Sequence, residues 1–174
     1  MLRLREKGCH VVASFGNISA SGGVYVGVAA DKIVSNPGTI TGSIGVILRG
    51  NNLSKLLDRV GVKFETVKSG AFKDILSPDR ALGAEERELL QALIDSSYEQ
   101  FVAAVAEGRK LDPSRVREFA DGRVFSGAQA KDLGLVDELG DEECARVLAA
   151  QLADLDEERC RVVTLGTVSY THLT

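Results

Sequence analysis

Histidine is scarce in this chain: His10 and His172 are the only two among 174 residues. Neither lies near a turn that would expose a nucleophile. An enzyme built from this sequence would need another general base, and a neutral lysine amine can take the proton of a serine hydroxyl. The scarcity of histidine therefore directs attention to serine and lysine.

Cysteine is also rare. Cys9, Cys144 and Cys160 are an odd number without CxxC spacing, which excludes a disulfide framework and a typical zinc site. The adjacent pair Cys9 and His10 is a poor candidate for catalysis, because neighbouring residues on a strand point to opposite faces. We expect no metal and no organic cofactor.

Tryptophan is absent, aromatic residues make up 5%, and the net charge is −4. A basic surface and aromatic stacking platforms are typical of nucleic-acid binding, so we expect no nucleic-acid partner. No apolar run is long enough to span a membrane, and the N-terminus lacks the apolar core of a signal peptide.

The remaining composition, 44% hydrophobic and 26% charged, is typical of one globular domain. Hydrophobic patterning predicts strands over Val11–Phe15, Lys32–Ser35, Thr39–Leu48, Lys63–Lys68 and Arg161–Leu165. It predicts helices over Val24–Ala30, from Asn52 or Ser54 to Val60, over Ala84–Glu107, from Pro113 to near Ala120, from Ser126 to Gly134 and over Asp141–Ala153. This alternation predicts α/β layering with crossover helices.

Both ends of the chain depart from that pattern. Residues 2–7 resemble the second half of a helix, and residues 168–174 do not continue the fold. We interpret the chain as a fragment whose N-terminal strands are missing. Residues 1–167 would form its domain, followed by a non-native or disordered tail over 168–174.

Ser21 is the first candidate for chemistry, because it follows a short strand and is followed by Gly22 and Gly23 at the start of a helix. Backbone N–H groups in the first turn of a helix lack intrahelical acceptors and suit a developing oxyanion. Gly22 would let a substrate carbonyl approach closely. The alternative is that Ser21 merely caps the helix.

Lys73 is the candidate base, provided that apolar neighbours such as Phe72, Ile75 and Leu76 lower its exposure to water. The alternative is a surface lysine paired with Asp74.

Ser43 lies between Ser21 and Lys73 along the chain, and its hydroxyl could hold the amine toward Ser21. Its alternative is a strand or bulge serine between flexible glycines.

Six short motifs occur in one order over residues 11–140, and together they resemble the signal peptide peptidase A family, serine peptidases of the S49 type. The motifs are Ala20-Ser21-Gly22-Gly23, Ala29-Ala30-Asp31-Lys32-Ile33, Thr41-Gly42-Ser43-Ile44-Gly45-Val46, Lys68-Ser69-Gly70-Ala71-Phe72-Lys73-Asp74, Ala120-Asp121-Gly122-Arg123-Val124-Phe125 and Leu135-Val136-Asp137.

The resemblance implies a ClpP/crotonase-like fold and a Ser/Lys dyad. Ser21 matches the nucleophile, Lys73 the general base, Ser43 the hydroxyl that orients the lysine, and Gly22 and Gly23 the oxyanion and substrate-binding region. It also implies ring-like homo-oligomers, in some of which serine and lysine come from different subunits. Remnant signal peptides would be the substrates, cleaved at the bacterial cytoplasmic membrane by an extracytoplasmic domain.

Two family features have no counterpart here: the membrane anchor and an upstream glycine that supplies a second oxyanion donor. Losing one such donor can raise the barrier by about 3 kcal/mol, so this fragment alone could be inactive. The alternatives are an S49 peptidase of the phage capsid maturation type and an inactive crotonase-like scaffold that binds peptides.

Overall fold

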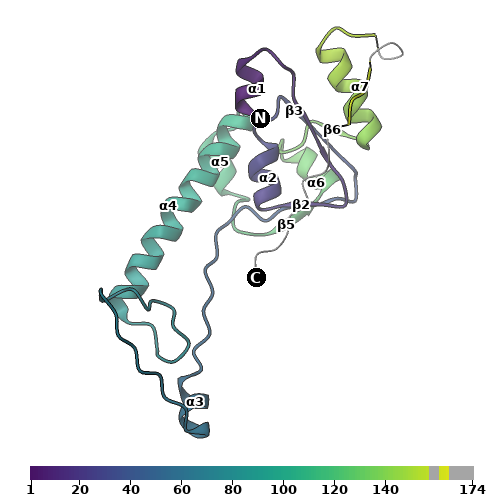
Figure 1. The fold of residues 1–174 in the computed structure, drawn as a ribbon. Coiled ribbons are helices and arrows are strands. Elements are labelled where there is room, and N and C mark those ends of the chain that lie inside the picture. The colour runs from purple at the N-terminus through teal and green to yellow at the C-terminus, as the bar shows by residue number, and fades with distance from the viewer. Residues whose placement is uncertain (157–160, 165–174) are drawn as a thin grey trace.

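The computed structural model describes residues 1–156 and 161–164. In chain order its elements are α1 (Leu2–Glu6), β1 (Val12–Phe15), β2 (Ile18–Ala20), α2 (Gly22–Gly27), β3 (Lys32–Ser35), β4 (Ile40–Gly42), α3 (Ser54–Val60), α4 (Ala84–Arg109), α5 (Pro113–Arg117), β5 (Val124–Ser126), α6 (Gly127–Asp132), β6 (Glu138–Leu139) and α7 (Glu142–Leu152) (Figure 1). The predicted α/β class is confirmed. The predicted tail over 168–174 lies outside the described residues.

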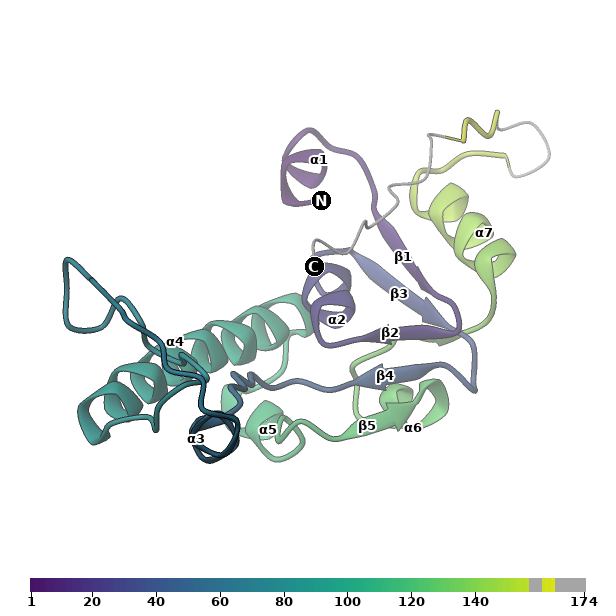
Figure 2. The same cartoon turned by 60° about the horizontal axis from the view of Figure 1, so that its bottom comes forward.

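The strands form two small sheets. One has the order β1-β3-β6 with parallel pairs, and the other has the order β2-β4-β5, in which β2 and β4 are parallel and β5 is antiparallel. Figure 2 shows β1 beside β3 and β2 beside β4. The first four strands therefore alternate between the two sheets, and α2 connects β2 of the second sheet to β3 of the first.

The buried core lies where α2 and the second half of α4 meet the strands. Its members are Phe15, Val24, Val28, Ile33, Ile44, Phe101, Val102, Val105, Ala106, Val116, Phe119, Ala120, Ala130, Leu135 and Val136. Two glycines allow this packing. A Cβ on Gly108 of α4 would lie 2.0 Å from the Val28 carbonyl oxygen, and one on Gly27 would lie 2.5 Å from the Phe15 ring. Small residues thus bring α4 and β1 directly against α2.

Residues 46–82, which we call the arm, leave this body alongside the first half of α4 (Figure 1). The described core contains no residue between Ile44 and Phe101. The buried apolar side chains of α4 accordingly begin at Phe101, and Leu89 and Leu93 in the first half of the helix are exposed. The arm is held by contacts other than the core.

Several local predictions are confirmed, because each depends on a few neighbouring residues. The side chains of Asp112, Ser126 and Asp141 accept hydrogen bonds from backbone N–H groups at the starts of α5, α6 and α7. Gly61 ends α3 in the left-handed conformation, at φ 73°.

Three strand predictions are wrong in whole or in part. The strand predicted over Thr39–Leu48 is confined to β4, and residues 63–68 form no strand. Residues 161–164 are exposed and form none either, while Leu165 lies outside the described residues. An extended segment becomes a strand only where a neighbour completes its hydrogen bonds, and the arm has no such neighbour among residues 1–156 and 161–164.

None of the helices in the described ranges combines the length and the apolar character required to cross a bilayer.

Candidate active site

Ser21 occupies the junction between β2 and α2. Its N–H donates to the Gly42 carbonyl at 2.8 Å, which continues the pairing of β2 with β4. Its backbone has φ 52° and ψ −113°, a conformation that side-chain-bearing residues rarely adopt. Such strain persists only where the surrounding structure imposes it, and it is concentrated at functional sites.

The Ser21 side chain makes no capping hydrogen bond to α2. The alternative interpretation, in which Ser21 serves as an ordinary helix cap, is therefore wrong. The strained turn presents a half-buried hydroxyl that is not used in holding the helix.

Gly22 and Gly23 form the first turn of α2 directly after the serine. A Cβ on Gly22 would meet nothing within 4 Å, whereas one on Gly23 would lie 2.9 Å from the Ser19 hydroxyl oxygen. Gly22 consequently faces open space beside Ser21, and its missing side chain leaves room for another molecule.

A cavity of ≈350 Å³ adjoins this turn. It is lined by α2, by the chain that follows β4 and by the middle of α4, through Ser21, Gly22, Tyr25, Gly45, Val46, Ser97, Gln100 and Phe101. Sequence reasoning identified only the first two of these. Tyr25 could have been found, because it lies one helical turn after Ser21. The contribution of α4 could not, because the relevant contacts depend on how α4 packs on α2.

Ser43 directly follows β4, just as Ser21 directly follows β2. Since Ala20 and Gly42 are register partners, the two serines occupy neighbouring ends of paired strands. Ser43 is half-buried at φ 51°, and its N–H donates to the Arg123 carbonyl at 2.7 Å. The structure thus brings Ser21, Gly22 and Ser43 into one region.

Lys73 is not in that region of the chain. It lies in the turns of residues 71–76 on the arm, and its side chain is exposed. The expected burial by Phe72, Ile75 and Leu76 is absent within the single chain, because the arm does not pack on the core. The alternative pairing with Asp74 is wrong as well, since Asp74 pairs with Lys68 and Arg80.

The distance between the Lys73 turns and the Ser21 cavity can be estimated along α4. The turns that carry Lys73 are joined to Glu86 near the start of this helix, whereas Ser97 and Phe101 line the Ser21 cavity. Eleven residues from Glu86 to Ser97 correspond to about 16 Å of helix. One copy of the chain does not place the Lys73 amine beside the Ser21 hydroxyl.

Asp74, which follows Lys73 in the sequence, belongs to a polar cluster in which the carboxylates have lowered pKa values. Hydrogen bonds from Arg80 and then from Lys68 hold the pKa of Asp74 well below its usual range. Arg80, followed by the Gly83 N–H, lowers the pKa of Glu86 to about 2. Both carboxylates are therefore ionised at neutral pH.

Within residues 1–156 and 161–164, no group of three or more histidine, cysteine or acidic side chains is arranged to hold a metal ion.

Comparison with known proteins decides the family. The sequence profile of peptidase family S49 matches residues 3–156. The chain belongs to peptidase family S49. This confirms the resemblance inferred from the ordered motifs.

Individual relatives agree with that assignment. A Synechocystis protein with the provisional name of a protease is 63% identical over 163 residues, which cover 94% of this chain and 58% of the relative. An Enterococcus faecium protein provisionally named signal peptide peptidase SppA is 43% identical, over 83% of this chain and 42% of the relative. Protease 4 of Salmonella typhi is 39% identical, over 88% of this chain and 25% of the relative.

The chain thus spans between a quarter and three fifths of the length of these relatives. A solved structure from Hyphomonas neptunium, provisionally titled an enoyl-CoA hydratase/isomerase family protein, is similar with a TM-score of 0.44 at 20% identity, covering 85% of this chain and 40% of that chain.

Proposed function

We propose that this chain carries the catalytic residues of a serine endopeptidase that uses a Ser/Lys dyad. Ser21 is the nucleophile, Lys73 the general base and Ser43 the hydroxyl that orients the lysine. The amides of Gly22 and Gly23 receive the oxyanion. The observation that carries this proposal is the strained Ser21 turn, which offers a hydroxyl not engaged by the helix to a cavity.

In the proposed reaction the Ser21 Oγ attacks the scissile carbonyl carbon while the neutral Lys73 amine takes the hydroxyl proton. The carbonyl oxygen becomes an oxyanion that backbone N–H groups stabilise. Collapse breaks the C–N bond, and the Lys73 ammonium returns the proton to the leaving amine. Water then attacks the acyl-enzyme, with Lys73 again as the base, and releases Ser21.

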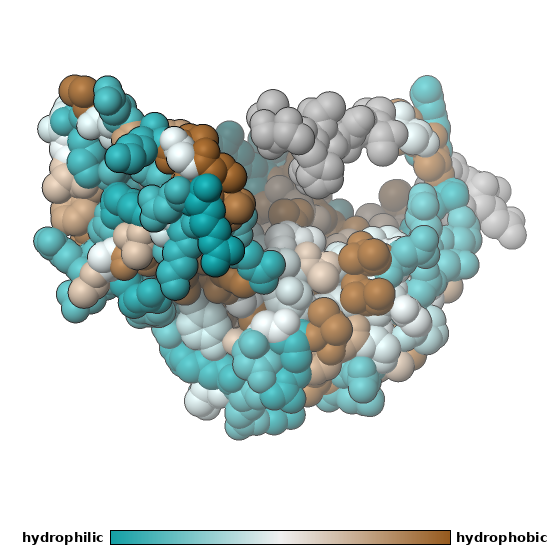
Figure 3. Space-filling view, turned by 90° about the horizontal axis from the view of Figure 1, so that it is seen from below, coloured by the Kyte–Doolittle hydropathy of each residue, from teal (hydrophilic) through white to brown (hydrophobic). Residues whose placement is uncertain are grey.

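We further propose that the dyad is completed between copies in a ring-like homo-oligomer. Lys73 is exposed on the arm, and its turns connect to the end of α4 remote from the Ser21 cavity. The arm also exposes many apolar side chains, a feature typical of protein interfaces: Val46, Ile47, Leu48, Leu53, Leu56, Val60, Val62, Phe64, Val67 and Phe72. Hydrophobic residues reach the surface among hydrophilic ones on the face drawn in Figure 3.

The proposed substrates are remnant signal peptides, cleaved at the bacterial cytoplasmic membrane by a domain outside the cytoplasm. One relative bears the name signal peptide peptidase, which supports this choice.

The test uses the full-length protein. Ser21→Ala and Lys73→Ala should each abolish cleavage of a signal peptide without changing the assembled mass, and normal turnover by either variant contradicts the proposal. Co-assembling the two inactive variants distinguishes the geometries. A dyad shared between neighbours regenerates activity at about a quarter of randomly formed interfaces, whereas a dyad within one subunit regenerates none.

Labelling with a serine-directed acylating reagent separates the enzyme from the scaffold alternative. A peptidase should be labelled at Ser21, and Lys73→Ala should slow that labelling. A scaffold that only binds peptides should remain unlabelled.

A further inference from the structure

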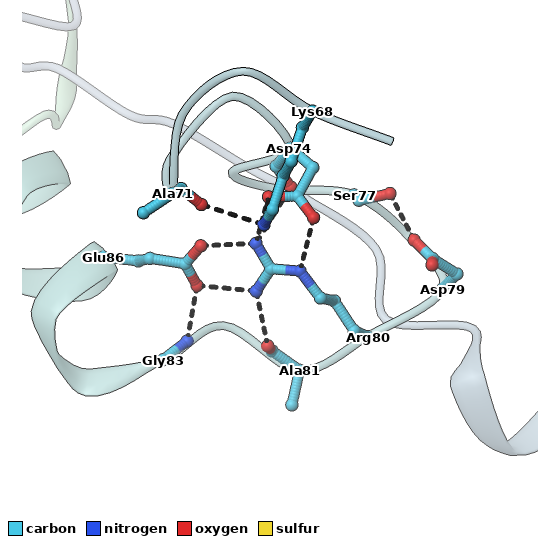
Figure 4. Close-up of polar contacts among 9 residues, drawn as sticks. All are labelled: Lys68, Ala71, Asp74, Ser77, Asp79, Arg80, Ala81, Gly83 and Glu86. Atoms are coloured by element: carbon cyan, nitrogen blue, oxygen red, sulfur yellow. Dashed lines mark hydrogen bonds and ion pairs between the residues drawn. The ribbon is translucent and has the colours of Figure 1, made fainter. Parts of the chain in front are cut away.

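One arginine joins the turns that carry Lys73 to the start of α4. The Arg80 Nε donates to Asp74 Oδ2 at 3.1 Å and its Nη2 to Asp74 Oδ1 at 2.9 Å (Figure 4). The same guanidinium donates from Nη1 to Glu86 Oε2 at 2.8 Å and from Nη2 to Glu86 Oε1. Arg80 therefore binds two carboxylates at once, one on each side.

Each carboxylate is itself anchored. Glu86 is 6% exposed, and its Oε2 also accepts the Gly83 N–H at 2.8 Å at the start of α4. Asp74 Oδ1 accepts from the Lys68 amine at 2.6 Å, and that amine also donates to the Ala71 carbonyl at 2.9 Å. The two cations and two anions balance, so the cluster can remain partly buried without excess charge.

This cluster takes the place of an apolar core in the arm. No arm residue belongs to the buried core or packs against it from a half-buried position. Leu76, between Asp74 and Arg80, has φ 65°, which is unfavourable for a bulky side chain. A conformation of this kind must be imposed by its surroundings. The contact between Asp74 and Arg80 joins residues on either side of Leu76 and is suited to impose it.

Three ion pairs on the surface of the described chain are different. Arg115 with Glu118, Arg117 with Glu99 and Arg123 with Asp121 each join two side chains that are about half exposed. The Asp74 and Glu86 side chains, in contrast, are only 16% and 8% exposed. Burial and bidentate geometry make the Arg80 contacts the stronger constraint.

We propose that Arg80 is a positioning residue for catalysis: by holding Asp74 against Glu86, it sets where the adjacent Lys73 amine is presented. This inference rests on the proposed role of Lys73 as the general base. It does not depend on which subunit supplies the serine, because Lys68, Lys73, Asp74, Arg80 and Glu86 all belong to one copy.

A base displaced by about 1 Å can lose on the order of 100-fold in rate, while substrate binding elsewhere in the site is unaffected. Arg80→Met in the full-length protein should therefore lower kcat about 100-fold and leave KM within about threefold of the wild-type value. Arg80→Lys retains the charge but not the fork that reaches both carboxylates, so it should restore only part of kcat.

The acid limb of the curve of kcat/KM against pH provides a second readout. Arg80→Met leaves Asp74 and Glu86 balanced only by Lys68, and the net negative charge favours protonation of a neighbouring base. The limb should move to higher pH, which a purely structural loss of folded protein would not cause. Arg117→Met is the matched control, since it removes another guanidinium that pairs with α4 but is remote from Lys73. It should leave kcat, KM and the pH profile unchanged.

An assembled Arg80→Met protein with wild-type kcat and an unmoved acid limb overturns the positioning role. If Arg80→Met fails to assemble, Arg80→Lys decides the question by the same criteria. Lys73→Ala is measured in parallel. When it is inactive and the Arg80 variants are fully active, only the positioning role fails; when Lys73→Ala is itself active, the proposed dyad fails.

Discussion

Tyr25 and Phe101 meet edge to face beside Ser21, with ring centroids 5.3 Å apart and ring planes at 81°. Tyr25 lies on α2 and Phe101 on α4, and both line the cavity next to the serine. This contact joins the helix that follows the nucleophile to the long helix that leads to the arm. It also limits the space available to a bound side chain.

Tyr25→Ala should enlarge that cavity and change the peptide preference. We expect kcat/KM for a peptide with phenylalanine at the cleavage point to rise on the order of tenfold relative to one with alanine. The measurement is a competition between the two peptides in the full-length enzyme. Tyr25→Phe keeps the ring and should preserve the original ratio. An unchanged ratio in Tyr25→Ala would show that the cavity does not receive that side chain.

Gly108→Ala should destabilise the fold by forcing α4 away from α2. The added Cβ would lie 2.0 Å from the Val28 carbonyl oxygen. Overpacking of this kind costs about 1–3 kcal/mol, which exceeds the gain of about 0.5–1 kcal/mol from alanine in a helix. Urea unfolding measures the balance. Gly38→Ala is the control, because a Cβ there meets nothing within 4 Å. A Gly108→Ala protein as stable as the wild type would contradict the close packing.

Arg109→Met should be destabilising because it leaves the Asp137 carboxylate with the half-exposed Lys32 as its remaining cation and removes its buried partner. Arg109 at the end of α4 is 6% exposed and donates to Asp137, at 2.5 Å, while Asp137 also accepts from the Ile33 N–H at 2.8 Å. Burial raises the pKa of Asp137, but the Ile33 N–H and the nearby cations outweigh it, so the net shift is downward.

Breaking such a pair costs on the order of 3 kcal/mol, measured as the change in free energy of unfolding in urea. Arg115→Met removes an exposed pair with Glu118 and should leave the midpoint unchanged. Equal effects of the two substitutions would mean that burial of the Arg109 pair is not important.

Stability should fall in acid partly through the Arg80 cluster. The folded pKa of Glu86 is about 2 against an ordinary value of 4.5, and the pKa of Asp74 is also lowered. For depressed pKa values the stabilisation is complete above the unfolded value and is lost as pH falls toward the folded value. The free energy of unfolding should therefore decrease from pH 4.5 toward pH 2, followed by circular dichroism. Arg80→Met should make this decrease shallower. The same slope in both proteins would rule out the cluster as its source.

Sequence patterns predicted the elements whose formation depends on near neighbours. The helix starts near Pro113, Ser126 and Asp141 and the helix end at Val60 were predicted correctly, because the bonds that set these boundaries span only a few residues. The strand predicted over residues 63–68 was wrong for the opposite reason. Its alternating residues suit a strand, but no second strand lies beside them in the described part of the chain.

The features of the candidate site also fall into those predicted from sequence and those set by tertiary structure. The ordered motifs identified the family, and each motif can be recognised within a short segment. The glycines after Ser21 likewise predicted a turn that exposes its hydroxyl. Tertiary structure alone decided that α4 lines the serine cavity, that Ser43 comes to a neighbouring strand end and that Lys73 stays exposed on the arm, joined by Arg80 to the far end of α4. These relationships join segments far apart in the chain, and packing between elements, which no short segment encodes, sets them.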